Sequence, residues 1–113
     1  FLGVDSDQEL TLSSDLAAIT LTSGLKNIGN SLIWFFDEMD AGRTYFGQEV
    51  SLGLAEGGVG MVTDKNFATF ASDDCKAAIT AAEEAIKAGT LTVDTAIGDT
   101  DNKIVGLRDS VRP

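Results

Sequence analysis

The 113-residue sequence contains no histidine, a single cysteine and a single proline. Histidine is the commonest general base and the commonest neutral metal ligand, so its absence excludes Ser-His-Asp and Cys-His catalysis. The one cysteine, Cys75, allows neither an internal disulfide nor a zinc site built from several cysteines. We therefore expect no metal, no cofactor and no enzymatic activity.

Basic residues are also few. The sequence has 8 Lys and Arg against 18 Asp and Glu, which gives a formal net charge of -10. Nucleic-acid binding needs clustered Lys and Arg to contact phosphates, so we expect no nucleic-acid partner. The same acidic excess opposes electrostatic docking on an anionic membrane surface.

The sequence lacks an initiating methionine, a signal peptide and an apolar run of membrane length. It opens directly on an apolar, strand-like segment, so we expect it to be a piece of a longer precursor. Hydrophobic residues make up 43% and glycine supplies 12 positions. This composition suits one small domain with a core and many tight turns.

Strand-like and helix-like segments alternate along the chain, which predicts an α/β domain with a mostly parallel sheet flanked by helices. Strands are expected over residues 1–4, 16–22 and 49–54, after a glycine turn within 57–63, and over the short segment 91–93. The segment 16–22 is apolar and partly β-branched, and its pattern also fits a helix.

The clearest amphipathic helix is expected over residues 23–41, with Ser23 as its N-cap and Gly42 as its left-handed stop. Its apolar residues recur at helical spacing. They are Leu25, Ile28, Leu32, Phe35, Phe36 and Met39.

A second helix is expected from the cap Ser72, followed by two acids, to residue 88, with Gly89 as its end. Residues 64–71 are predicted to form a loop that carries two phenylalanines. Residues 94–113 are predicted to form a polar, mostly irregular tail.

Two charged residues are candidate ligand contacts. Asp5 directly follows the strand 1–4, and the carboxyl ends of strands are where ligands bind in open α/β sheets. The plain alternative is a strand-terminal turn or a helix cap. Lys26 follows the second expected strand and can bring an ammonium to the same region, or it is a solvated lysine in the first turn of a helix. Asp7 is interpreted as a surface turn, because two acids alone make a poor metal site.

Four blocks stand in a characteristic order: GVDSDQ at 3–8, LTSGLK at 21–26, GLAEGGVGM at 53–61 and AIKAGTLTV at 85–93. In order and spacing they resemble the carboxyl-terminal part of the basic membrane protein family. This family comprises the purine nucleoside receptor A-like substrate-binding lipoproteins of ABC importers. The resemblance covers about residues 1–93 and leaves the tail 94–113 unmatched.

The resemblance implies a type I periplasmic-binding fold, closing on a purine nucleoside or a similar small solute between two lobes. A chain of 113 residues would be an incomplete part of that fold. The family pattern puts ligand contacts at Asp5 and Lys26. Implied partners are an ABC permease and the missing amino-terminal part of the chain. The implied location is extracytoplasmic, as a lipoprotein anchored to the cell membrane by a residue outside this chain.

The alternative is a small α/β regulatory or protein-interaction module without a transport role. A fragment with open sheet edges is also expected to associate with itself.

Overall fold

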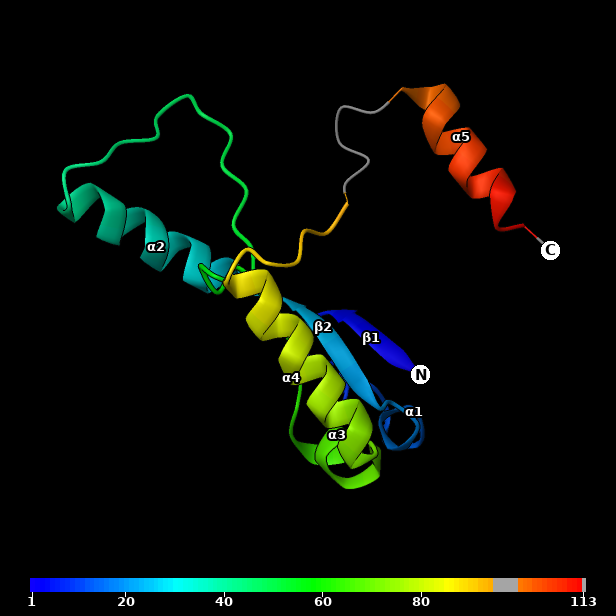
Figure 1. Ribbon diagram of the computed structural model, residues 1–113. Coiled ribbons are helices and arrows are strands. Elements are labelled where there is room, and N and C mark those ends of the chain that lie inside the picture. The colour runs from blue at the N-terminus through cyan, green and yellow to red at the C-terminus, as the bar shows by residue number, and fades with distance from the viewer. Residues whose placement is uncertain (95–99, 113) are drawn as a thin grey trace.

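Three short strands form one mixed sheet, and five helices are connected to it (Figure 1). The computed structural model describes residues 1–94 and 100–112. The strands are β1 (Leu2–Asp5), β2 (Thr22–Lys26) and β3 (Val59–Met61). The helices are α1 (Ser14–Ala18), α2 (Ile28–Asp40), α3 (Lys65–Phe70), α4 (Asp73–Lys87) and α5 (Asp101–Ser110). The expectation of an α/β chain is confirmed at this level.

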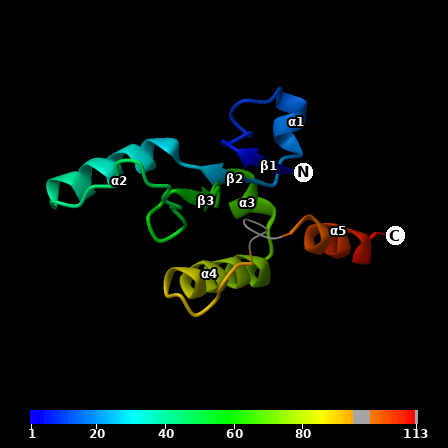
Figure 2. The same ribbon diagram turned by 90° about the horizontal axis from the view of Figure 1, so that it is seen from above.

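β2 lies at the centre of the sheet, between β1 and β3. β1 and β2 run parallel, with Gly3 opposite Ser23 and Asp5 opposite Leu25. β3 is antiparallel to β2, so the sheet is mixed, whereas a mostly parallel sheet was predicted. The view from above places α1 and α4 on opposite sides of the sheet (Figure 2).

The predicted strand over residues 16–22 is wrong in its boundaries. Its first part belongs to α1, as the helical alternative allowed, and β2 begins only at Thr22. Asn66, far along the chain, donates from Nδ2 to the carbonyl oxygens of Ala17 and Thr20, both at 2.9 Å. The Ala17 carbonyl also accepts from the N–H of Thr20 at 3.1 Å, so Asn66 adds a second hydrogen bond there and connects α3 to the end of α1.

The predicted helix over residues 23–41 begins later than expected, at Ile28, because residues 22–26 pair in the sheet. Ser23 is therefore not the N-cap; Asn27 takes that position. The backbone N–H of Asn27 donates to Gly58 at 2.8 Å and its side chain donates to Gly57 at 3.1 Å. The predicted stop at Gly42 is confirmed by its φ of 80°.

Two predicted strands are wrong. Residues 49–54 form no strand, because the chain turns back there: the N–H of Gly53 donates to Glu56 at 2.8 Å and that of Gly58 to the Gly53 carbonyl at 2.9 Å. Residues 91–93 are also without strand structure. The glycine turn does lead into a short strand, β3, as predicted.

Helices occupy two stretches that were predicted to be irregular. The expected loop 64–71 contains α3, which buries Phe67 and leaves Phe70 exposed. The expected irregular tail contains α5, whose first turn is capped by Thr100. The division of the chain at residue 93 remains a prediction.

α4 follows its local signals closely. Ser72 accepts a hydrogen bond from the N–H of Cys75 at 3.2 Å, two acids follow in the first turn, and Lys87 lies in the last. Gly89 beyond the end has a φ of 70°. The predicted start, length and stop of this helix are confirmed.

The outer end of α2 is fixed by a charged clamp. Arg43 donates two hydrogen bonds to Glu38, from Nε and from a terminal nitrogen, and Tyr45 donates a third at 2.8 Å. The Arg43 guanidinium, followed by the Tyr45 hydroxyl, lowers the pKa of Glu38 from 4.5 to about 2. Tyr45 in turn stacks obliquely on Trp34, with ring centroids 5.1 Å apart.

Buried apolar side chains are few. Val62 and Phe67 are the buried hydrophobic residues of the described chain. The accessible surface is 8274 Å², against roughly 5,900 Å² for a compact protein of this mass. The radius of gyration is 17.4 Å, against about 13 Å for a compact chain of this length. The molecule therefore exposes much surface that a compact domain would bury.

The close approach of Gly3 to Ser23 gives a first prediction. A Cβ on Gly3 would lie 2.3 Å from Ser23 Oγ, whereas one on Gly24 would meet nothing within 4 Å. We expect Gly3→Ala to lower the free energy of unfolding by about 1–3 kcal/mol, because it overpacks the β1–β2 contact. Urea unfolding of both variants tests this, with Gly24→Ala as the matched strand control. Equal effects of the two substitutions would contradict the prediction.

The clamp at the end of α2 gives a second prediction. The pKa of Glu38 is lower in the folded protein than in the unfolded chain. Ionised Glu38 therefore stabilises the fold fully above pH 4.5, and this stabilisation is lost as the pH falls toward 2. An NMR titration of the Glu38 carboxyl carbon should have its midpoint near pH 2. Arg43→Gln should move that midpoint toward 4.5, while Arg108→Gln, which removes the base of the exposed Arg108–Asp109 pair, should leave it unchanged.

Candidate functional site

Asp5 ends β1 in an unusual backbone conformation. Its φ is 70°, in the left-handed region that few residues other than glycine adopt, although Asp and Asn tolerate it. The next residue, Ser6, folds back with its N–H on the Val4 carbonyl at 2.9 Å. The strand therefore stops abruptly and leaves the Asp5 carboxylate at the end of the sheet.

Lys26 is the last residue of β2, not a residue in the first turn of a helix. Since β1 and β2 are parallel and Asp5 pairs with Leu25, both side chains leave the sheet at the same edge. Lys26 Nζ lies 3.2 Å from Asp5 Oδ1. The two residues singled out from the sequence are therefore neighbours in space.

The ion pair faces solvent. The side chains of Lys26 and Asp5 are 63% and 65% exposed. Among the described residues, each is the only charged or hydrogen-bonding partner of the other side chain. Exposed pairs of this kind stabilise a fold by about 0–1 kcal/mol. Both groups are consequently free to bind polar atoms of a ligand at little energetic expense to the fold.

Two small hollows exist elsewhere on the described surface. One, of about 170 Å³, is lined by Asn30, Ile33, Trp34, Asp37 and Glu56. The other, of about 150 Å³, has an apolar lining of Phe1, Leu12, Leu16 and Ile19. Neither includes the ion pair, and small-molecule pockets typically measure roughly 300–1,000 Å³. The Asp5–Lys26 pair therefore lies on an open edge, which needs a second surface to become a cleft.

A hydrogen-bonded turn fixes the segment that follows Asp5. The N–H of Gln8 donates to Ser23 Oγ at 3.1 Å, and Gln8 Nε2 donates to the Val4 carbonyl at 3.2 Å. Ser23 is 1% exposed, so this bond is partly shielded from water. Glycine at position 3 leaves room for this hydrogen bond, because a Cβ there would lie 2.3 Å from Ser23 Oγ.

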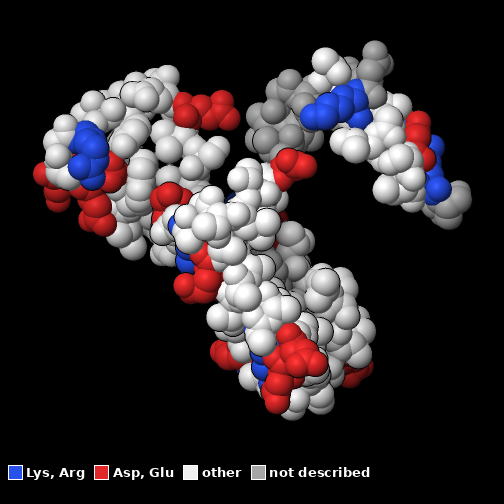
Figure 3. Space-filling view, viewed as in Figure 1, with Lys and Arg blue, Asp and Glu red and all other residues white. Residues whose placement is uncertain are grey.

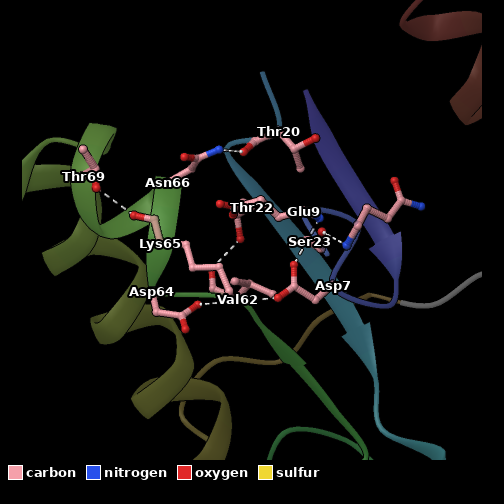
Figure 4. A network of polar contacts seen from close by, with 11 residues as sticks. Asp7, Glu9, Thr20, Thr22, Ser23, Val62, Asp64, Lys65, Asn66 and Thr69 are labelled. Atoms are coloured by element: carbon pink, nitrogen blue, oxygen red, sulfur yellow. Dashed lines mark hydrogen bonds and ion pairs between the residues drawn. The ribbon is translucent and has the colours of Figure 1, made fainter. Parts of the chain in front are cut away.

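Asp7 belongs to a different charged cluster (Figure 4). Its carboxylate lies 2.8 Å from Lys65 Nζ, which also contacts Asp64 at 2.9 Å. Hydrogen bonds to Asp7 and then to Asp64 raise the pKa of Lys65, and Lys65 lowers the pKa of Asp64. Asp7 also accepts a bond from the N–H of Glu9 at 3.2 Å, which agrees with its interpretation as a turn residue. Among the residues whose side chains the structure describes, no group of three potential metal ligands occurs.

Sequence reasoning missed Lys65 and Asn66, which tie α3 to the region around β1 and α1. Lys65 reaches a partner 58 positions away, so no local pattern indicates the contact. The glycine turn 57–60 packs against the side chains of Asn27 and Asn30, which both donate a hydrogen bond to the Gly57 carbonyl. Thr22 donates to the Val62 carbonyl at 2.5 Å and so joins the centre of the sheet to the segment before α3.

The sequence matches no protein-family model and no curated protein. The resemblance to the basic membrane protein family therefore rests on the four sequence blocks alone. Every helix within the described part of the chain is too short or too polar to traverse a lipid bilayer.

The exposure of the ion pair gives a third prediction. We expect Asp5→Asn to change the free energy of unfolding by less than about 1 kcal/mol, because the pair is solvated and Asn also tolerates a positive φ. Urea unfolding measures this change. A loss well above that value would mean that the pair supports the fold rather than remaining available to a ligand.

Proposed function

We propose that the chain is part of an extracytoplasmic solute-binding protein of an ABC importer and that it binds a purine nucleoside or a similar small solute. The observation that supports this most directly is the exposed Asp5–Lys26 pair at the ends of two parallel strands. The four blocks that resemble the basic membrane protein family include both residues. The resemblance also supports the finer fold assignment, a type I periplasmic-binding fold.

The chemistry of the pair suits a polyol. An ionised carboxylate can accept two hydroxyl hydrogens at once, and such charge-assisted bonds are roughly twice as strong as neutral ones. In our proposal Asp5 accepts the hydroxyl hydrogens of the ribose, while Lys26 donates to a ribose oxygen or to an acceptor on the base. Lys26 also balances the charge of Asp5, so a neutral ligand leaves no unpaired charge when water is displaced.

The binding edge is open, so the proposal includes a second wall. That wall belongs to the amino-terminal part of a longer chain, which supplies the other lobe and the surface that stacks on the base. In this proposal the protein works with an ABC permease and is held at the cell membrane by a lipoprotein anchor. The proposed role is capture and release, with no chemical step and no cofactor.

A second candidate function is that of a small regulatory or protein-interaction module. The observation that favours it is the large exposed apolar surface, which includes 21 large hydrophobic side chains along the described chain. Large exposed apolar surfaces are typical of sites that contact other proteins. This function needs neither Asp5 nor Lys26.

Calorimetric titration with inosine, adenosine and guanosine tests the nucleoside proposal. The sample is the protein that carries this chain together with its amino-terminal part. We expect Asp5→Asn and Lys26→Met each to weaken binding roughly ten- to a hundredfold, because each removes a charged hydrogen-bond partner. Asp73→Asn, which removes the acid of the exposed Asp73–Lys76 pair on α4, is the matched control.

The control variant should bind as tightly as the unaltered protein. No heat with any of the three nucleosides, or unchanged affinity in both site variants, would refute the proposal. Tight binding that is equally weakened by Asp73→Asn would show a general charge effect instead of a site.

A further inference from the structure

The chain makes a strained three-residue turn around Asp5. The N–H of Ser6 donates to the Val4 carbonyl, two residues earlier, at 2.9 Å, and Asp5 between them has a φ of 70°. A γ-turn with a positive φ at its centre is a rare and strained conformation. Strained residues persist only where the surrounding structure holds them, and they cluster at active sites, ligand clamps and switches. The Asp5 turn therefore needs contacts from outside it.

The side chain of Gln8 supplies such a contact. Gln8 Nε2 donates to the Val4 carbonyl at 3.2 Å, so the oxygen that closes the turn accepts two hydrogen bonds. If β1 continued as an extended strand, Gln8 would lie roughly 13 Å from Val4, because a strand rises about 3.3 Å per residue. The hydrogen bond from Gln8 therefore forms only when the chain turns at Asp5, and it stabilises the closed turn over an extended one.

The sheet in turn holds Gln8 in place. The backbone N–H of Gln8 donates to Ser23 Oγ at 3.1 Å, and Ser23 is one of the most buried residues of β2. A Cβ on Gly3 would lie 3.0 Å from Gln8 Cβ, so Gln8 lies directly against β1. Gln8 is consequently fixed to both of the strands that end in Asp5 and Lys26.

The closed turn also sets the position of the Asp5 carboxylate, because φ determines how the side chain is oriented relative to the preceding peptide group. In this conformation Asp5 Oδ1 lies 3.2 Å from Lys26 Nζ. An exposed ion pair of this kind contributes too little to hold a strained turn by itself. A ligand that needs this orientation of Asp5 binds more weakly in proportion to the fraction of molecules in which the turn is open.

We propose that Gln8 is a positioning residue of the candidate site, which holds Asp5 in the strained turn before a ligand arrives and does not contact the ligand. The role of Gln8 in the turn is independent of the ligand. Its effect on affinity rests on the proposed function, in which Asp5 accepts the hydroxyl hydrogens of a nucleoside. A site that is ordered in advance binds more tightly, because the ligand does not have to order it.

Gln8→Met tests this role, because methionine keeps the length of the side chain but has no N–H to donate. Gln48→Met is the matched control, since Gln48 Nε2 also donates to a carbonyl four residues earlier, that of Thr44, at 3.3 Å. Both substitutions leave every charged group in place, including the acidic and basic groups that Figure 3 shows at the outer end of α2 and at one end of α4. A difference between the two variants therefore reports the bond to Val4.

The nuclear Overhauser effect between HN and Hα of Asp5 reports the turn without a ligand. It is strong at a positive φ, because the two hydrogens then lie close together, and it is weaker in an extended strand. In the 113-residue chain we expect a strong effect in the unaltered protein and in Gln48→Met, and a clearly weaker one in Gln8→Met. Equal effects in all three proteins, or an equal decrease in both variants, overturn the inference.

Cross-strand effects between Gly3 and Ser23 show in the same spectra whether the sheet is intact. We expect them to be unchanged in Gln8→Met, because the backbone N–H of Gln8 still donates to Ser23 Oγ. Their loss in this variant would mean that Gln8 supports the sheet rather than the turn, and this result would also overturn the inference.

Binding kinetics test the effect on affinity in the protein that carries this chain together with its amino-terminal part. Stopped-flow measurements use whichever of inosine, adenosine and guanosine binds. We expect Gln8→Met to lower the association rate constant and the affinity roughly three- to tenfold, because fewer molecules have the turn closed. The dissociation rate constant should stay unchanged, and Gln48→Met should change neither constant.

The two measurements separate failure of this inference from failure of the proposed function. If the unaltered protein binds none of the three nucleosides, the proposed function is refuted, and the nuclear Overhauser effect of Asp5 alone decides whether Gln8 holds the turn. Faster dissociation from Gln8→Met would show that Gln8 contacts the ligand, which overturns its role as a positioning residue. Unchanged association with Gln8→Met would overturn that role as well.

Discussion

The parallel pairing of β1 with β2 is the contact on which the rest of the molecule depends. It brings backbone segments into register that are twenty positions apart, with Gly3 directly opposite Ser23. Small residues make this approach feasible, because no side chain on Gly3 separates the strand from Ser23 and the Gln8 turn. The same register delivers Asp5 and Lys26 to one edge. The Asp5–Lys26 pair is consequently a direct product of the sheet, whereas a cleft around it needs a second surface.

Polar side chains, rather than a large apolar core, connect the elements around this sheet. Thr22 links β2 to the segment before α3, Asn66 links α3 to the end of α1, and Lys65 links α3 to the Asp7 turn. Such bonds define geometry well but add little net stability, about 1 kcal/mol each. The apolar residues that would normally supply the stability remain mostly at the surface. The architecture is therefore well specified locally and dependent on further contacts for its strength.

Features fixed by neighbouring residues could be predicted from the sequence. α4 carries its own cap and its own stop, Gly42 ends α2, and a glycine turn precedes β3. The pairing of Asp5 with Lys26 was accessible in part. Asp5 directly follows a strand-like segment, whereas Lys26 was expected in the first turn of a helix and is the last residue of β2. Features fixed by distant residues were not accessible. The boundary between α1 and β2 depends on Asn66, and the start of α2 depends on pairing of β2 with β3. The local sequence pattern therefore predicted a helix from residue 23, although residues 22–26 pair in the sheet.

The left-handed backbone at Asp5 has a consequence for how this position can vary. Glycine, asparagine and aspartate adopt that conformation readily, whereas other residues meet a steric penalty of roughly 1–2 kcal/mol. Of the three residues, only aspartate carries a charge. The acid at this edge therefore has no acceptable acidic replacement, since glutamate would incur the backbone penalty. Backbone conformation and charge therefore both favour aspartate at this position.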